Sequence, residues 1–159
     1  MTDSAATLDD TQARALGVAL FNATWRLMER TDRSVSDDDA MLHMAHASRH
    51  HWTQVGTAAN LARGEWLCSR VYAVLGRGEP AMHHASRVLD LCRVNGIADW
   101  DLGFAYEALA RAAAVGGDMN GARMFTDQAL AAAADIAEDD DRDLLLADLE
   151  TIPGQTRYW

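Results

Sequence analysis

The sequence predicts an all-α protein, and three observations support this fold class. The chain has 159 residues, of which thirty are alanine and only two are proline. Alanine has the highest intrinsic helix propensity and proline disrupts helix interiors, so this composition favours helices. Apolar residues recur at intervals of three and four along most of the chain, which is the period of a helix with one buried face. The length is that of one domain.

An internal repeat organises the chain, because a shift of 41 residues brings similar residues into register. Three sets coincide: Ala40, Ala81 and Ala122; Ala47, Val88 and Ala129; and Leu27, Cys68 and Leu109. The same shift aligns Trp25 with Trp66 and His43 with His84. Repeats of this length indicate stacked supersecondary units. We predict three units of two helices each, over about 9–53, 57–95 and 99–137.

The first unit is predicted to contain one helix over about 9–30 and a second over about 37–52. Three acids, Asp37, Asp38 and Asp39, open the second helix, where the helix dipole favours negative charge.

The second unit carries clearer boundary signals. Thr57 is the predicted N-cap of a helix over 58–75, and Gly76-Arg77-Gly78 ends that helix. The next helix is predicted over 79–93, with Pro80 in its first turn, and Asn95-Gly96 gives it a C-terminal signal.

The third unit repeats this design, with a cap at Asp99 or Asp101 and helices over 102–115 and 121–136. A last short helix over about 141–149 is expected to cover the open end of the stack, because the last unit of an array otherwise exposes its apolar face. We therefore expect a single domain over 9–151, a flexible N-terminus at 1–8 and a C-terminal tail at 152–159.

The turn residues Leu75-Gly76 and Gly117-Asp118, with the small Ala81 and Ala122 after them, resemble the tetratricopeptide repeat pattern. Tyr72 stands where that family often has an aromatic residue. The period of 41 departs from the family's repeat of about 34 residues. The resemblance implies a right-handed stack of three antiparallel helical hairpins with a C-terminal capping helix. It also implies a concave groove that binds a peptide or partner protein, and it carries over no catalytic residues.

The charge pattern excludes some functions and points to the middle of the chain. The net charge is −10, which argues against a general nucleic-acid binder. No apolar run is long enough for a membrane span, and no signal peptide opens the chain, so we expect a cytoplasmic protein with Cys68 and Cys92 as buried, reduced thiols. Residues 41–98 carry three acids, six arginines and all six histidines, net +3. This window is the predicted binding region. The alternative is that its arginines only lie on solvent-exposed helix faces and bind nothing.

Three histidines of the predicted helix over 37–52 share one face, since His43, His46 and His50 are three and four residues apart. They form either a polar helix face or, with Glu65, a metal site. In an antiparallel hairpin Glu65 lies level with His46. A carboxylate in an apolar stripe needs a partner, for which His46 is the first candidate and Arg49 or Arg70 the second. This pair is either a buried structural ion pair or a pair exposed in the groove.

A candidate ligand cluster surrounds Arg63 and Arg70, which lie two turns apart on one helix face. Gly64, in the middle of this helix, indicates a close approach by another helix or by a ligand, and helix packing is the preferred interpretation. Together the candidate ligand-binding residues are His46, His50, Trp52, Asn60, Arg63, Glu65, Arg70 and Tyr72. We expect Arg63→Ala to weaken ligand binding without lowering thermal stability.

The leading hypothesis for function is a non-catalytic binding scaffold without a cofactor, which recognises a protein segment or a small anionic ligand in a central His/Arg-rich groove. The alternative is a protein that binds a divalent transition metal through His43, His46, His50 and Glu65. A third reading, an enzyme with Glu65 and His46 as an acid–base pair, lacks any phosphate-loop or nucleophile motif. A homodimer formed through the N-terminal face of the stack stays open.

Overall fold

The computed structural model describes residues 8–159, and this part of the chain is all-α, which confirms the predicted fold class. It contains seven helices: α1 (Asp10–Met28), α2 (Val35–Val55), α3 (Ala58–Val74), α4 (Gly78–Asn95), α5 (Asp99–Val115), α6 (Met119–Ala133) and α7 (Asp139–Glu150). The predicted flexible N-terminus falls almost wholly outside the described residues. None of the helices in 8–159 is both long and apolar enough to cross a membrane.

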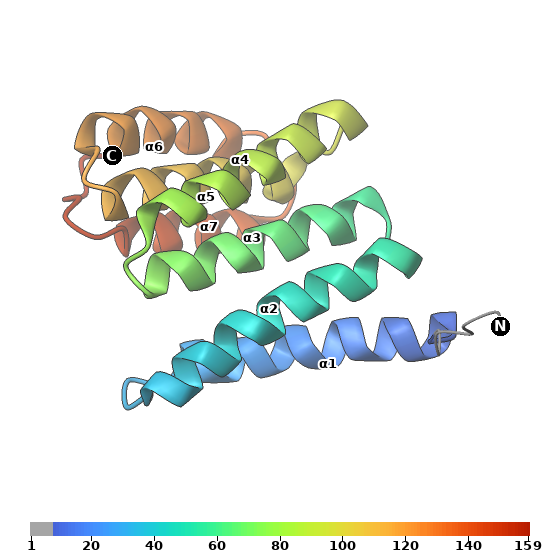
Figure 1. Ribbon diagram of the computed structural model, residues 1–159. Helices are drawn as coiled ribbons and strands as arrows, with labels where there is room; N and C mark the ends of the chain where they lie inside the picture. Colours follow the sequence, from blue (N-terminus) through green and yellow to red (C-terminus); the bar gives the residue numbers. More distant parts are fainter. Residues whose placement is uncertain (1–7) are drawn as a thin grey trace, which may run out of the picture.

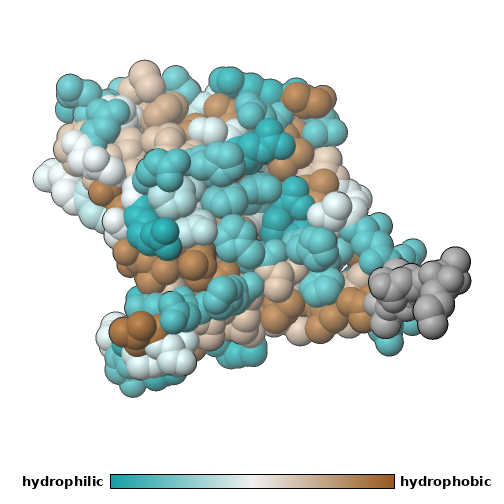
Figure 2. All heavy atoms as spheres, in the orientation of Figure 1, coloured by the Kyte–Doolittle hydropathy of each residue, from teal (hydrophilic) through white to brown (hydrophobic). Residues whose placement is uncertain are grey.

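The helices pack as hairpin-like pairs, α1 with α2, α3 with α4, and α5 with α6 (Figure 1). The pairs then stack on one another, because α3 contacts both α1 and α5. The last helix, α7, packs against α5 and α6. This order places α1, α3, α5 and α7 on one side of the stack. The face in Figure 2 is that of α2 and α4, and it is largely hydrophilic.

Local sequence signals set most helix ends. Asp9, Ser34 and Thr57 each form a capping box with the residue three positions later, which satisfies backbone N–H groups that the helix leaves unpaired. Thr57 is the predicted N-cap. Gly96 ends α4 in the left-handed conformation, with φ of 62°, as the Asn95-Gly96 signal predicts.

The start of α5 differs from the prediction, because its N-cap is Ala98 instead of Asp99 or Asp101. Asp99 adopts a positive φ of 59°, which short polar side chains tolerate better than most. Its Oδ1 accepts a hydrogen bond from the backbone N–H of Ala137. Asp99 therefore ties the beginning of α5 to the connection between α6 and α7.

The buried faces of α2, α4 and α6 correct the repeat register. The buried positions correspond in three rows: Met41, Ala45, Ser48 and Trp52; Ala81, Ala85, Val88 and Cys92; and Ala122, Thr126, Ala129 and Ala133. The shift is therefore 40 residues between the first two units and 41 between the last two. Ala40 is exposed, so its predicted alignment with Ala81 is wrong by one residue. His43 corresponds to His83 and not to His84.

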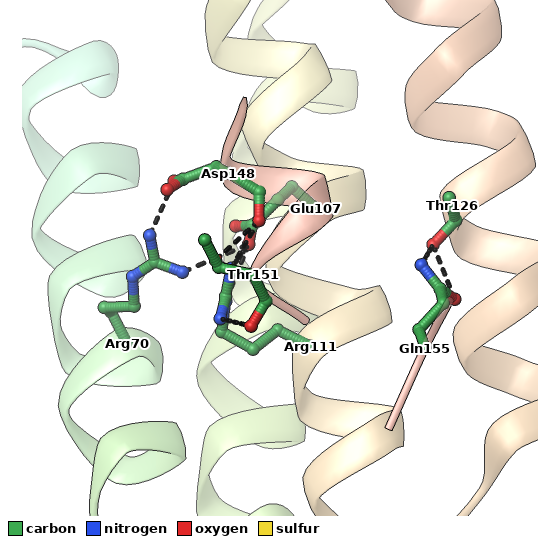
Figure 3. A network of polar contacts seen from close by, with 7 residues as sticks. All are labelled: Arg70, Glu107, Arg111, Thr126, Asp148, Thr151 and Gln155. Atoms are coloured by element: carbon green, nitrogen blue, oxygen red, sulfur yellow. Dashed lines mark hydrogen bonds and ion pairs between the residues drawn. The ribbon is translucent and has the colours of Figure 1, made fainter. Parts of the chain in front are cut away.

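The C-terminal part of the chain covers α5 and α6. Leu145 and Leu149 of α7 are fully buried, whereas Leu144 is 59% exposed. The predicted tail after α7 also packs on the stack: Ile152 is buried, and the side chain of Gln155 bonds Thr126 of α6 (Figure 3). The predicted capping role thus extends beyond α7 into the last residues of the chain.

Candidate functional site

A surface cavity of about 430 Å³ lies between α1, α3, α5 and α7, and we call it the aromatic groove. Its apolar lining includes five aromatic side chains and one exposed leucine: Phe21, Trp25, Trp66, Trp100, Phe104 and Leu144. Its volume lies within the range of ligand pockets, roughly 300–1,000 Å³.

The aromatic rings form a continuous row across three helices. Trp25 of α1 stacks on Trp66 of α3 with 5.6 Å between ring centroids. Trp66 then meets Phe104 of α5 edge to face at 6.1 Å, and Phe104 meets Trp100 at 6.3 Å. The predicted shift of 41 residues pairs Trp25 with Trp66, whereas the buried positions of α2 and α4 are 40 residues apart. Trp100 and Phe104 were not among the predicted site residues, although their spacing of one helical turn indicates a shared helix face.

Arg63 lies in the groove but its charge is already paired. Its Nε and Nη2 donate to the two carboxylate oxygens of Asp101 over 3.0 and 2.9 Å, and its guanidinium lies 4.3 Å from the centroid of the Trp100 ring. The bond to Asp101 raises the pKa of Arg63 above its ordinary value. The arginine therefore links α3 to α5 and is not a vacant anion site.

Arg70, the second groove arginine, joins a buried network of four charges (Figure 3). Its two Nη atoms donate to Glu107 over 3.1 Å and to Asp148 over 2.5 Å. Arg111 donates to the same Glu107 oxygen over 2.7 Å. Arg70 was a candidate partner of Glu65, and this prediction is wrong, because its side chain reaches α5 and α7 instead.

The carboxylates of this network are strongly desolvated. Burial, with the charge of Glu107 close by, raises the pKa of Asp148 although Arg70 and Arg111 oppose the shift. Glu107 is 1% exposed, and its Oε2 has no hydrogen-bond partner among residues 8–159. The network balances two positive with two negative charges but leaves one acceptor unfilled.

A smaller cavity of about 170 Å³ adjoins the aromatic groove, since Phe21 and Arg63 line both. Trp52 and Asn60, two of the predicted site residues, lie here with Gly64. A Cβ at Gly64 would come within 2.6 Å of Arg49 Cδ. The close helix approach predicted at this glycine is therefore confirmed.

Glu65 is 8% exposed and bridges α2 and α4. Arg49 Nε donates to Oε1 over 2.8 Å, and His84 Nδ1 bonds Oε2 over 2.7 Å. Burial alone raises the pKa of Glu65, but the His84 bond and the Arg49 charge outweigh it, so this pKa lies below its ordinary value. A buried ion pair is confirmed with the second candidate, Arg49. The prediction that His46 is the first partner of Glu65 is wrong, because Glu65 bonds Arg49 and His84 instead. The predicted Glu65–His46 pair is therefore not formed.

His46 lies next to Glu65 but bonds other groups. Its Nε2 is 3.0 Å from Tyr72 Oη, and its Nδ1 is 3.8 Å from Cys68 Sγ. Tyr72 in turn stacks on His84, with ring planes 8° apart. Burial lowers the pKa of His46, and the nearby His84 lowers it further. We call Arg49, Glu65, His84, His46 and Tyr72 the histidine network.

The structure does not bring the eight predicted ligand-binding residues together. Arg63 and Arg70 line the aromatic groove, Trp52 and Asn60 the smaller cavity, and His46, Glu65 and Tyr72 belong to the histidine network. His50 is exposed beside His51. Helix geometry explains the division, because residues two apart, such as Arg63 and Glu65, point about 200° apart on a helix. The groove thus holds arginines and aromatic rings but not the predicted histidines.

No three histidine, cysteine, aspartate or glutamate side chains of residues 8–159 converge in a group that could hold a metal ion. The alternative set of His43, His46, His50 and Glu65 is therefore not assembled. Both cysteines are free and buried, as predicted.

Comparisons of the chain with protein-family models, with curated proteins and with solved structures found no significant match.

Proposed function

We propose that this protein is a non-catalytic helical-repeat scaffold of the tetratricopeptide-like kind, which holds a segment of a partner protein in the aromatic groove. The observation that carries this proposal is the groove itself, a row of four contacting aromatic rings beside the exposed Leu144. Clustered aromatic side chains are enriched at the centres of protein interfaces.

The architecture favours a helical segment as occupant. Among the described helices, α1 contacts only α2 and α3, so it lies apart from α5 and α7 across the groove. Each wall helix offers one face, as the spacing of Asp141, Leu144 and Asp148 on α7 illustrates. An amphipathic helix laid between these walls would bury its apolar face against all four helices.

The charges favour a protein segment over the small anionic ligand that the sequence left open. Both groove arginines already bind carboxylates. An anion that recruited Arg63 would leave Asp101, which is itself buried, without its partner, and an unpaired buried charge is costly. Apolar burial has no such penalty.

A labelled neutral peptide tests the proposal. The peptide has roughly 18 residues, or five helical turns, with leucine on one face and glutamine on the other. We expect its fluorescence anisotropy to rise on titration with the protein. Leu144→Glu should abolish this rise, because it places a charge in the groove. The matched control is Val94→Glu, at an 84% exposed position of α4 outside the groove.

The thermal midpoints of both variants should match the wild type, since both positions are exposed. Equal binding of the peptide by the Leu144→Glu and Val94→Glu variants would contradict the proposal.

A further inference from the structure

We infer that the segment held in the aromatic groove is cationic, with lysine or arginine side chains along the edge that faces α7. This inference rests on the proposed function and adds the charge of the partner. It follows from the distribution of unpaired charges around the groove.

The α7 wall is strongly acidic. Residues 138–150 contain seven acids and one arginine, net −6. Three of these acids form ion pairs: Asp139 with Arg142, Asp148 with Arg70, and Glu150 with Arg157. Asp141 lines the groove and has no ion-pair partner in the described chain. This wall therefore presents uncompensated negative charge to an occupant.

Among the described residues, neither arginine of the groove is left unpaired to offset the charge of Asp141. Arg63 donates two hydrogen bonds to the Asp101 carboxylate. Arg70 donates to the carboxylates of Glu107 and Asp148. An acidic segment would meet Asp141 and Asp148 without a vacant cation, and like charges brought together at an interface are unfavourable.

The ion-pair network beside the groove shows how far the acid Asp148 of the α7 wall is already partnered. Arg70 and Asp148 line the groove, whereas Glu107, whose Oε2 has no hydrogen-bond partner among residues 8–159, is buried and does not line it. An ammonium or guanidinium group that enters beside Asp148 would add an N–H donor to a carboxylate that Arg70 alone bonds among residues 8–159. Burial raises the pKa of Asp148, and an added positive charge there would favour its ionised form.

Three matched peptides test the charge of the partner. All carry the same leucine face, and their polar edges carry lysine, glutamine or glutamate. We expect affinity to fall in that order at low salt. The preference for lysine over glutamine should shrink as salt rises, because exposed charges are screened.

A pair of variants separates the groove from general attraction to an acidic protein. Asp141→Asn should weaken binding of the lysine peptide about two- to fivefold, the range of an exposed ion pair. Asp143→Asn removes the same charge from an exposed position of α7 outside the groove and should leave the affinity unchanged.

The outcomes distinguish the two proposals. If the lysine and glutamine peptides bind equally at low salt, the groove keeps its function but the cationic partner is excluded. Equal weakening by Asp141→Asn and Asp143→Asn would show a general attraction and would also overturn the inference. If none of the three peptides binds, the proposed function itself fails.

Discussion

Replacing Glu65 with alanine removes the one side chain that bonds both α2 and α4 from within α3. Arg49 and His84 would then lose their acceptor, at side-chain exposures of 22% and 16%. Breaking a buried pair by deleting one member costs about 3–5 kcal/mol. The partial exposure of both partners reduces this to about 2–4 kcal/mol, which for a domain of this size lowers the melting temperature by about 4–16 °C.

Thermal and urea unfolding, followed by circular dichroism at pH 7, measure this loss directly. Glu79→Ala is the matched control, because Glu79 is exposed, and it should change stability by no more than about 0.5 kcal/mol. If Glu65→Ala lowers the free energy of unfolding by less than about 1 kcal/mol, the bonds of Glu65 to Arg49 and His84 do not stabilise the fold as the geometry indicates.

The pH dependence gives a second check on the same residue. The pKa of Glu65 is lowered from 4.5 in the folded protein, so its stabilisation is complete above that value and is lost as pH falls through the folded pKa. The difference between Glu65→Ala and the wild type should therefore narrow below pH 4.5. A difference that stays constant down to pH 3 would contradict this linkage.

Three further predictions concern other buried groups. Arg63→Ala should lower stability by about 1–2 kcal/mol, because it leaves the buried Asp101 carboxylate unpaired; unchanged urea unfolding would show that the sequence-based expectation was right. His46 has a lowered pKa, so the unfolded chain takes up its proton first and stability falls as pH drops below 6.5; His46→Gln should flatten this part of the stability profile, and an unaltered profile would exclude His46 as its source. Burial raises the pKa of Cys68 to about 12 and that of Cys92 to about 11, so both thiols should react with a disulfide reagent at pH 8 far more slowly in the folded than in the urea-unfolded protein; equal rates would contradict their burial.

The helices could be predicted from the sequence because their signals are local. Helix propensity, the spacing of apolar residues and the N-cap at Thr57 each depend on residues within one or two helical turns of one another. The register of the first unit could not be predicted. The alanine shared by positions 40, 81 and 122 suggested a shift of 41 residues, whereas the burial of Met41 requires that Met41 correspond to Ala81. Equivalent positions of a repeat are those whose side chains face the same neighbouring helix. Identical residues in two units are only an incomplete guide to these positions.

The candidate site was harder to predict because it depends on which distant helices meet. The need of Glu65 for a partner follows from its place in an apolar stripe, and Arg49 from the adjacent helix was within reach of the hairpin argument. The Arg70–Asp148 pair joins residues 78 positions apart, and no local pattern indicates it. The aromatic groove likewise combines side chains of four helices.

The position of α1 at the end of the stack has a thermodynamic consequence. Because it contacts only α2 and α3 among the described helices, the first hairpin can open while the remaining hairpins stay folded, as sub-global units of repeat proteins do. Amide hydrogens of α1 should accordingly exchange faster than those of α5. A ligand in the groove would touch Phe21 and Trp25 of α1, so occupancy should slow exchange in α1 by mass action on this opening equilibrium.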